Sequence, residues 1–307
     1  MKKKLVLILT LLISFQMAMG QSAAPTSKII DANKLLNDLK ILSADDMQGR
    51  QFGSPSIVKA REFVETRFKQ SGLQTLGNSY LQTFEITARN GNKVSGANVV
   101  GFIKGKKNAD KYIIITAHYD HVGVRNGEVF NGADDNASGT SALFAMAEYF
   151  NKNQPNNSLI FVAFDGEESG LQGAKKFVEN LPVKKESILL NINMDMISHN
   201  DKNELYASGI YHYPNLKPYL DTLAASKDTK IKLLIGHDQP NPPQDDWTNQ
   251  SDHFAFHQAK IPFIYFGVED HKDYHRATDE FQNINQVFYV HAVETILEAT
   301  KLFDKNL

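Results

Sequence analysis

Two patterns of hydrophobic and polar positions alternate along the chain. Apolar residues recur at three- and four-residue intervals over residues 31–42 and 56–70, which predicts two amphipathic helices. Short runs of Ile, Val, Leu and Phe without polar alternation predict strands that are buried on both faces. These runs cover residues 81–88, 97–103, 112–116, 159–164, 188–194 and 261–266. Further helices are predicted at residues 139–150, 171–180, 216–225 and 285–302.

The alternation of strands and helices predicts an α/β fold. It favours a three-layer αβα sandwich with a mixed, largely parallel central sheet. In such folds ligands bind beyond the carboxyl ends of the strands. Residues 236–250 are rich in Pro, Asp and Asn and predict a long surface loop, which carries the only tryptophan, Trp247.

The amino-terminal residues have the pattern of a cleavable export signal. Three lysines precede an apolar run over residues 5–15, and small residues follow at Ala18 and Gly20. The run is shorter than the roughly 20 apolar residues of a membrane span. We therefore expect residues 1–20 to be removed and the mature protein to be periplasmic or secreted, without a membrane anchor.

Composition narrows the possible chemistry. The chain has 307 residues, of which 42% are hydrophobic and 22% are charged, as in ordinary globular proteins. Its 33 basic and 35 acidic residues nearly cancel, so the charge gives no reason to expect a nucleic acid partner. The chain has no cysteine, so any metal site must use histidines and carboxylates.

The first candidate ligands follow the strand predicted at residues 112–116. His118 emerges at its carboxyl end, and Asp120 could hold the second ring nitrogen, as a ligating histidine requires.

The next turn contains the adjacent carboxylates Asp134 and Asp135 and opens a helix. One of them is explained as an ordinary helix cap, but two adjacent residues cannot both cap. A carboxylate aimed away from the helix could bridge two cations about 3.5–4 Å apart.

Two further strands also end in acidic residues. Residues 159–164 lead into Glu167 and Glu168, which face different directions, so one can ligate a metal while the other acts as a base. Residues 188–194 lead into Asp195, which lies between two methionines. A carboxylate in such apolar surroundings is costly unless a cation or hydrogen-bond donors meet it.

His275 completes the set of candidate ligands. It follows the last predicted strand, within residues 273–279. Two histidines and three acidic ligands would then lie at strand ends of one sheet. This mixture of nitrogen and oxygen donors suits Zn²⁺ better than Mg²⁺ or Ca²⁺, which prefer oxygen alone.

Together these motifs resemble the secreted co-catalytic zinc aminopeptidases, a metallopeptidase family that also contains the glutaminyl cyclases. The matching segments are residues 118–120, 132–139, 167–168, 195 and 274–275, and residues 42–50 and 70–73 resemble the family's first helices. The resemblance covers residues 31–302 and implies the zinc exopeptidase fold. Residues 91–118 leave no room for the domain inserted in larger relatives, so we expect residues 21–307 to form a single catalytic domain.

The resemblance also implies a set of ligands for two Zn²⁺ ions per chain. Asp135 would bridge both ions. His118 and Asp195 would complete one site, and Glu168 and His275 would complete the other.

The remaining implied roles concern catalysis. Glu167 would be the general base, Asp120 would orient His118, and Tyr274 would help to hold the oxyanion. Asp252 and Asp279 are candidates for supporting positions around the ligands, and Trp247 is a candidate for the substrate pocket.

The activity implied is that of an aminopeptidase. A hydroxide shared by the two ions, with Glu167 as its base, would attack the peptide bond beside a free amino terminus. A substrate's α-amino group could pair with the acidic cluster, so the expected partners are peptides with a free amino terminus. We expect a monomer.

Two other functions fit parts of the pattern. A glutaminyl-peptide cyclotransferase would use similar ligands with one zinc, but such enzymes typically have a tryptophan where this chain has Tyr274. A non-catalytic binding protein could use the carboxylates to hold Ca²⁺, but histidines are poor Ca²⁺ ligands. Of the other histidines, we expect His121 to be an ordinary loop residue and His237, His257 and His271 to lie at the surface.

Overall fold

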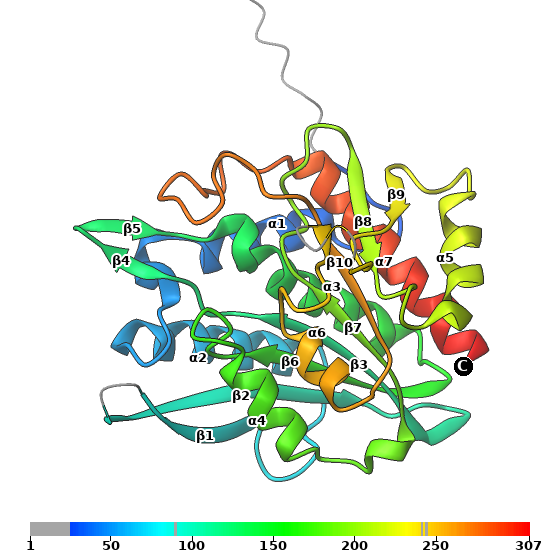
Figure 1. The fold of residues 1–307 in the computed structure, drawn as a ribbon, viewed down its shortest axis with the longest axis horizontal. Helices are drawn as coiled ribbons and strands as arrows, with labels where there is room; N and C mark the ends of the chain where they lie inside the picture. Colours follow the sequence, from blue (N-terminus) through cyan, green and yellow to red (C-terminus); the bar gives the residue numbers. More distant parts are fainter. Residues whose placement is uncertain (1–24, 89–90, 241, 243–244) are drawn as a thin grey trace, which may run out of the picture.

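A sheet of eight strands with helices on both faces forms the centre of the molecule in a computed structural model (Figure 1). The structure describes residues 25–307 except residues 89–90, 241 and 243–244, so the predicted export signal lies outside the described residues. Within the described ranges, no helix has the length and apolar character needed to cross a membrane.

The sheet is mixed, with a parallel centre. Its strand order is β1-β2-β6-β3-β7-β10-β8-β9. The strands are β1 (Leu81–Thr87), β2 (Lys93–Ile103), β3 (Asn108–His118), β6 (Asn157–Phe164), β7 (Ile188–Met194), β8 (Glu204–Ser208), β9 (Lys232–Ile235) and β10 (Phe263–Gly267). Neighbours among β6, β3, β7 and β10 are parallel, whereas β1, β2 and β8 join by antiparallel pairing. The carboxyl ends of the four central strands therefore meet at one edge.

Helices cover both faces of this sheet (Figure 1). Contacts place α1 (Ala32–Leu42), α2 (Pro55–Gln70), α3 (Gly139–Lys152), α5 (Lys217–Ala224) and α7 (Gln286–Asn306) in one layer, and α4 (Gln172–Glu179) and α6 (His253–Gln258) in the other. Adjacent residues of β3 face opposite layers, since Ile113 and Ile115 pack in the larger core and Ile114 packs in the smaller one. The predicted αβα sandwich is confirmed.

Several short elements were not predicted. These are β8, β9, α6 and the hairpin of β4 (Gly123–Arg125) and β5 (Glu128–Phe130), together with the short helical turns Ala133–Ser138, Lys185–Ser187 and Pro214–Leu216. They span only three to six residues each, too few for a hydrophobic period to be visible. The helical turn Asp45–Arg50 falls within residues 42–50, where the resemblance implies a helix. β2 also begins before the predicted residue 97, because its first residues pair with the edge strand β1.

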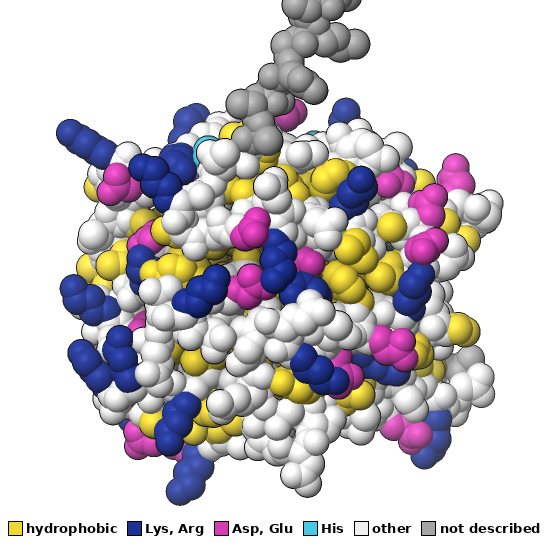
Figure 2. Space-filling view, turned by 180° about the vertical axis from the view of Figure 1, so that it is seen from behind, with side chains coloured by type: hydrophobic (Ala, Val, Ile, Leu, Met, Phe, Trp, Pro, Cys, Tyr) yellow, Lys and Arg dark blue, Asp and Glu magenta, His cyan; other side chains and the backbone are white. Residues whose placement is uncertain are grey.

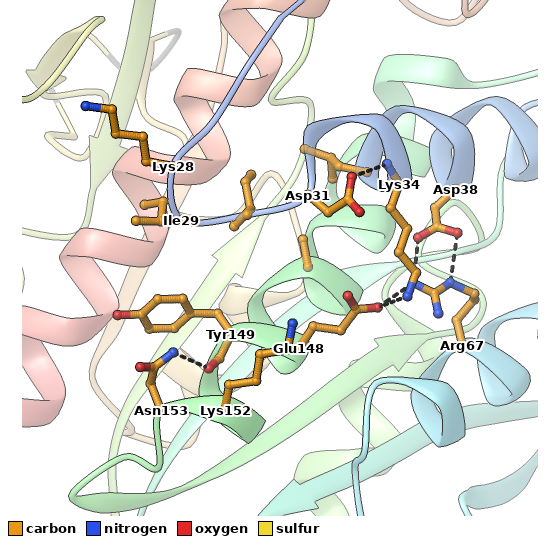
Figure 3. Close-up of a pocket in the computed structure, with 13 residues that line it drawn as sticks. Lys28, Ile29, Asp31, Lys34, Asp38, Arg67, Glu148, Tyr149, Lys152 and Asn153 are labelled. Atoms are coloured by element: carbon orange, nitrogen blue, oxygen red, sulfur yellow. Dashed lines mark hydrogen bonds and ion pairs between the residues drawn. The ribbon is translucent and has the colours of Figure 1, made fainter.

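A buried ion-pair network joins three helices of the larger layer (Figure 3). The Arg67 guanidinium of α2 donates to both carboxylate oxygens of Asp38 at 2.7–2.8 Å and to Glu148 at 2.9 Å. Lys34 also reaches Glu148, at 2.6 Å. The network lines a hollow of about 290 Å³ and satisfies charges that would otherwise be costly to bury. On the face seen in Figure 2, Lys and Arg side chains lie among Asp and Glu side chains rather than in a separate patch.

Candidate metal centre

Five acidic and histidine side chains meet at the carboxyl edge of the central strands. His118 is the last residue of β3, Glu168 follows β6, and Asp195 follows β7. Asp135 lies in the turn that leads into α3, and His275 lies in the loop after β10. The topology therefore brings together residues that are distant in sequence.

Asp135 faces both histidines, one with each carboxylate oxygen. Its Oδ1 lies 3.4 Å from His118 Nε2, which is also 3.2 Å from Asp195 Oδ1. Its Oδ2 lies 3.1 Å from His275 Nε2, which is also 3.2 Å from Glu168 Oε1. Ligands bound to zinc at about 2.0–2.1 Å are separated by roughly 3–3.5 Å. The donor atoms thus form two adjacent groups that share Asp135, each with the spacing of ligands around one cation.

A buried carboxylate holds the backbone of the Asp135 turn, and a glycine allows its conformation. The carboxylate of Asp279 accepts hydrogen bonds from the backbone N–H groups of Asp134 and Asp135 at 2.9–3.0 Å. Gly132 precedes the turn with φ 53°, and a Cβ there would overlap the carbonyl oxygen of Asp135 and lie 2.6 Å from the His121 ring. Only glycine fits this position without displacing the turn.

Arg50 holds three backbone segments in place beside the site. Its guanidinium is fully buried and donates to the carbonyl oxygens of Leu42, Tyr119, Asn131 and Gly132 at 2.6–3.0 Å. Burial lowers its pKa to about 10, although the nearby carboxylates act in the opposite direction and raise it. The carbonyls it binds belong to the end of α1, the residue after His118 and the entry to the Asp135 turn.

Asp120 contacts the glutamate pair more closely than it contacts His118. Its carboxylate accepts the backbone N–H groups of Glu167 and Glu168 at 3.0 and 3.4 Å. The group nearest to His118 Nδ1 is the backbone carbonyl of Asp120, at 3.2 Å, whereas its carboxylate lies 3.7 Å away. Asp120 therefore holds the turn after β6 with its side chain and the ring of His118 chiefly with its backbone.

Glu167 and Tyr274 lie at the same cavity as the cluster. Burial raises the pKa of Glu167 well above its ordinary value, and repulsion from Asp252 and Asp195 adds to this shift. A carboxylate with a raised pKa can accept a proton near neutral pH. Asp252 is fully buried beside this group, and neither of its carboxylate oxygens has a hydrogen-bond partner. Tyr274 stacks on His275, with ring centroids 4.1 Å apart.

Without a cation, the cluster is electrostatically incomplete. Burial opposes a positive charge on the two histidines, but the carboxylates outweigh it and raise the pKa of His275 to about 10 and that of His118 well above its usual value. Burial and the nearby Glu168 raise the pKa of Asp135. A divalent cation would displace these protons and neutralise the carboxylates, so the donor set fits a metal better than it fits protons.

His121 lies in the loop after β3, as expected, but it is buried within the site, and the expectation that His237 and His271 are surface residues is wrong. His121 is fully buried, and its Nδ1 lies 2.8 Å from Glu168 Oε1 and 3.6 Å from Asp135 Oδ2. His237 and His271 are also not surface residues, since their side chains are only 10% exposed. His121 follows β3 at the same edge of the sheet as His118. Its position just after the carboxyl end of a strand, which made His118 a candidate ligand, therefore made His121 a candidate as well.

A cavity of about 560 Å³ opens beside the cluster. Trp247 lines it together with Tyr265, His237 and the acidic residues of the site. Trp247 stacks on His237 with a centroid separation of 3.8 Å and an angle of 4° between the planes. The cavity has the volume of an ordinary small-ligand site, of about 300–1,000 Å³. The predicted loop at residues 236–250 thus forms one wall of it.

The fold and the donor set are those of an α/β protein with a candidate metal site. Residues 98–300 match the model of peptidase family M28, which covers more than half of the chain. The chain belongs to peptidase family M28.

Curated relatives match over part of their length. Aminopeptidase YwaD of Bacillus subtilis is 32% identical over 200 residues, which cover 62% of this chain and 40% of that protein. The alkaline phosphatase isozyme conversion protein of Escherichia coli is 29% identical over 168 residues, which cover 50% of this chain and 48% of that protein. The chain therefore spans less than half the length of these relatives.

Solved structures share the fold at low sequence identity. A glutaminyl cyclase from Porphyromonas gingivalis superposes with a TM-score of 0.74 at 18% identity, covering 92% of this chain and 100% of that one. A zinc aminopeptidase from Bacillus subtilis gives a TM-score of 0.71 at 16% identity, covering 90% and 95%. These similarities establish the architecture, which both kinds of enzyme share.

Proposed function

We propose that the protein is a zinc-dependent aminopeptidase that binds two Zn²⁺ ions. The observation that carries this proposal is the position of Asp135, whose two oxygens lie 3.4 and 3.1 Å from the Nε2 atoms of His118 and His275. A carboxylate shared between two groups of ligands is what a two-metal site requires.

Each ion would have three protein ligands. His118, Asp195 and Asp135 would hold one ion, and His275, Glu168 and Asp135 would hold the other. When bound, the ions supply Lewis acidity to a carbonyl oxygen and lower the pKa of a shared water towards about 7.

Glu167 would move the proton in this reaction. Its carboxylate lies at the same cavity as the ligands, so it could take a proton from the attacking water and return that proton to the leaving amine. Asp120 holds the backbone of Glu167 and so fixes where its carboxylate lies. Tyr274 lines the same cavity, and its O–H would donate to the carbonyl oxygen as negative charge develops there.

The acidic character of the cavity favours the amino end of a peptide. Asp135, Glu167, Glu168 and Asp195 all line it, so a protonated or metal-bound α-amino group would be held near the base. Trp247 and Tyr265 would contact the first side chain of the peptide.

Glutaminyl cyclisation is the second candidate, because a glutaminyl cyclase has the same fold over nearly all of this chain. It would need one zinc ion and would convert an amino-terminal glutamine without water. Tyr274 argues against it, since the resemblance places a tryptophan at this position in such enzymes.

The test is a panel of aminoacyl amides and glutaminyl peptides, assayed together with metal content. We expect hydrolysis of aminoacyl amides and two zinc ions per chain. Glu167→Gln should lower kcat by about 10²–10⁴-fold while the protein keeps its zinc. Glu179→Gln, at the exposed end of α4, is the matched control and should leave kcat unchanged. A single zinc with cyclisation of glutamine would overturn the peptidase proposal, and full activity of Glu167→Gln would overturn the assigned base.

A further inference from the structure

A second histidine and carboxylate cluster lies next to the candidate metal centre but shares none of its residues. His199 follows β7, and His271 and Asp273 lie in the loop between β10 and α7. One donor atom from each of the three side chains lies within 4.8 Å of the other two. No step of the proposed reaction uses these residues.

Two atoms of this cluster are buried without a hydrogen-bond partner. They are His199 Nδ1 and Asp273 Oδ2, which lie 3.8 Å apart. The two side chains are only 9% and 7% exposed. The other carboxylate oxygen of Asp273 accepts the Thr278 hydroxyl at 2.7 Å, which fixes the orientation of the carboxylate. Because unsatisfied buried polar atoms are rare and costly, a polar or charged partner is missing between them.

The third residue, His271, is oriented by Asp134. His271 Nε2 lies 3.0 Å from Asp134 Oδ2, while Asp134 Oδ1 accepts the backbone N–H and the hydroxyl of Ser198 at 2.6 and 2.8 Å. A carboxylate only accepts, so Nε2 carries the hydrogen and Nδ1 keeps its lone pair. Nδ1 accepts a hydrogen bond from the backbone N–H of Asp273 at 3.3 Å, a long separation. A carboxylate that holds one ring nitrogen is the usual partner of a metal-ligating histidine, and a cation at Nδ1 would replace this long hydrogen bond.

We propose that His199, His271 and Asp273 bind a divalent transition-metal ion that is separate from the two ions of the catalytic site. Two nitrogen donors and one carboxylate suit Zn²⁺, with water as the fourth ligand, and do not suit Ca²⁺ or Mg²⁺. Ligands of zinc lie roughly 3–3.5 Å apart. His199 Nδ1 and Asp273 Oδ2 lie 3.8 Å apart and the other donor pairs lie within 4.8 Å, so the side chains must approach one another as they bind the ion.

An ion at this position would join two segments that carry catalytic ligands. His199 belongs to the segment that follows Asp195, and Asp273 directly precedes Tyr274 and His275. Through His271 the ion would also reach Asp134, which is adjacent to Asp135. The ion would therefore stabilise the loop that delivers His275 and would take no part in the chemistry.

The test counts metal ions in the full chain. Wild type, His199→Asn and Asp273→Asn are dialysed against the same buffered free Zn²⁺, and bound zinc per chain is measured by mass spectrometry. We expect each variant to bind one ion fewer than wild type. His291→Asn in α7 is the matched control and should bind as many ions as wild type. Unfolding temperatures in EDTA, where no metal contributes, should agree among all four proteins and so exclude misfolding as the cause.

Equal zinc content in wild type and His199→Asn overturns the assignment. A cobalt titration gives a second readout, because Co²⁺ bound to nitrogen and oxygen donors absorbs visible light and the wild-type spectrum should contain a component that His199→Asn lacks. Identical spectra would also overturn it, as would saturation of the same site by Ca²⁺. The comparison remains valid if the protein proves to have no peptidase activity, because it measures the number of ions and not the reaction.

Discussion

Arg50→Ala should be among the most destabilising single substitutions in this protein. The guanidinium of Arg50 has no exposed surface and donates four hydrogen bonds to backbone carbonyls. A hydrogen bond to a charged group contributes about 1.5–3 kcal/mol, so the gross contribution is about 6–12 kcal/mol. Water that enters the vacated space will donate hydrogen bonds to some of the carbonyls. We therefore expect the free energy of unfolding to fall by about 4–6 kcal/mol.

The assay is urea unfolding followed by far-ultraviolet circular dichroism, in EDTA and again with excess zinc. Arg50→Lys keeps the charge but lacks the forked set of N–H donors, so it should lose less stability than Arg50→Ala. Arg125→Ala is the control, because Arg125 is exposed and contacts only the ring face of Phe130 among the interactions described, worth about 1 kcal/mol or less. The Arg50 variants should also bind zinc more weakly, since the carbonyls released adjoin His118 and the Asp135 turn.

A loss below about 2 kcal/mol for Arg50→Ala would refute this reasoning. It would mean that the four carbonyls find other donors, and that the three segments hold their positions without the guanidinium.

Three further predictions concern the site. Tyr274→Phe should lower kcat by about 10²-fold without loss of zinc. Tyr211→Phe, at the exposed surface, is the control and should leave kcat unchanged. An unchanged kcat in Tyr274→Phe would exclude a role of this tyrosine in holding the oxyanion. Burial raises the pKa of Asp165 from 3.8 to about 7, and repulsion from Asp120 adds to this shift. The metal-free protein should therefore lose stability as pH rises from about 4 to 7, because the folded state holds the proton more tightly. In urea unfolding, Asp165→Asn should lose less stability than wild type across this pH range. Equal pH dependence of stability in the two proteins would contradict the raised pKa assigned to Asp165. Zinc binding should release protons from His118 and His275, so zinc affinity measured by calorimetry should rise between pH 6 and 8, and a constant affinity would count against these residues as ligands.

The sequence predicted the layers of the fold because its central strands are long apolar runs. The same runs placed His118, Glu168 and Asp195 at one edge, since parallel strands end together. Short segments such as β8 and β9 escaped detection because they lie towards the sheet margin and contain few residues in which alternation could show.

Contacts between side chains and backbone groups could not be predicted from the sequence. The pairing of Asp120 with the N–H groups of Glu167 and Glu168 depends on how two loops approach each other, and residue types do not encode that distance. The same is true of Arg50, whose partners are four carbonyl oxygens. Export, the single domain and the monomeric state stay predictions.

The order in which the ligands occur along the chain affects when the site can form. Asp135 lies before the middle of the chain, but His275 lies in its last stretch, after β10 has paired with β7. During synthesis, a partly made chain could present His118, Asp135 and Glu168 but could not close the second half of the site. Long-range pairing of this kind is also slow. Products that end before residue 275 would therefore lack His275 and so have only part of the second group of candidate ligands.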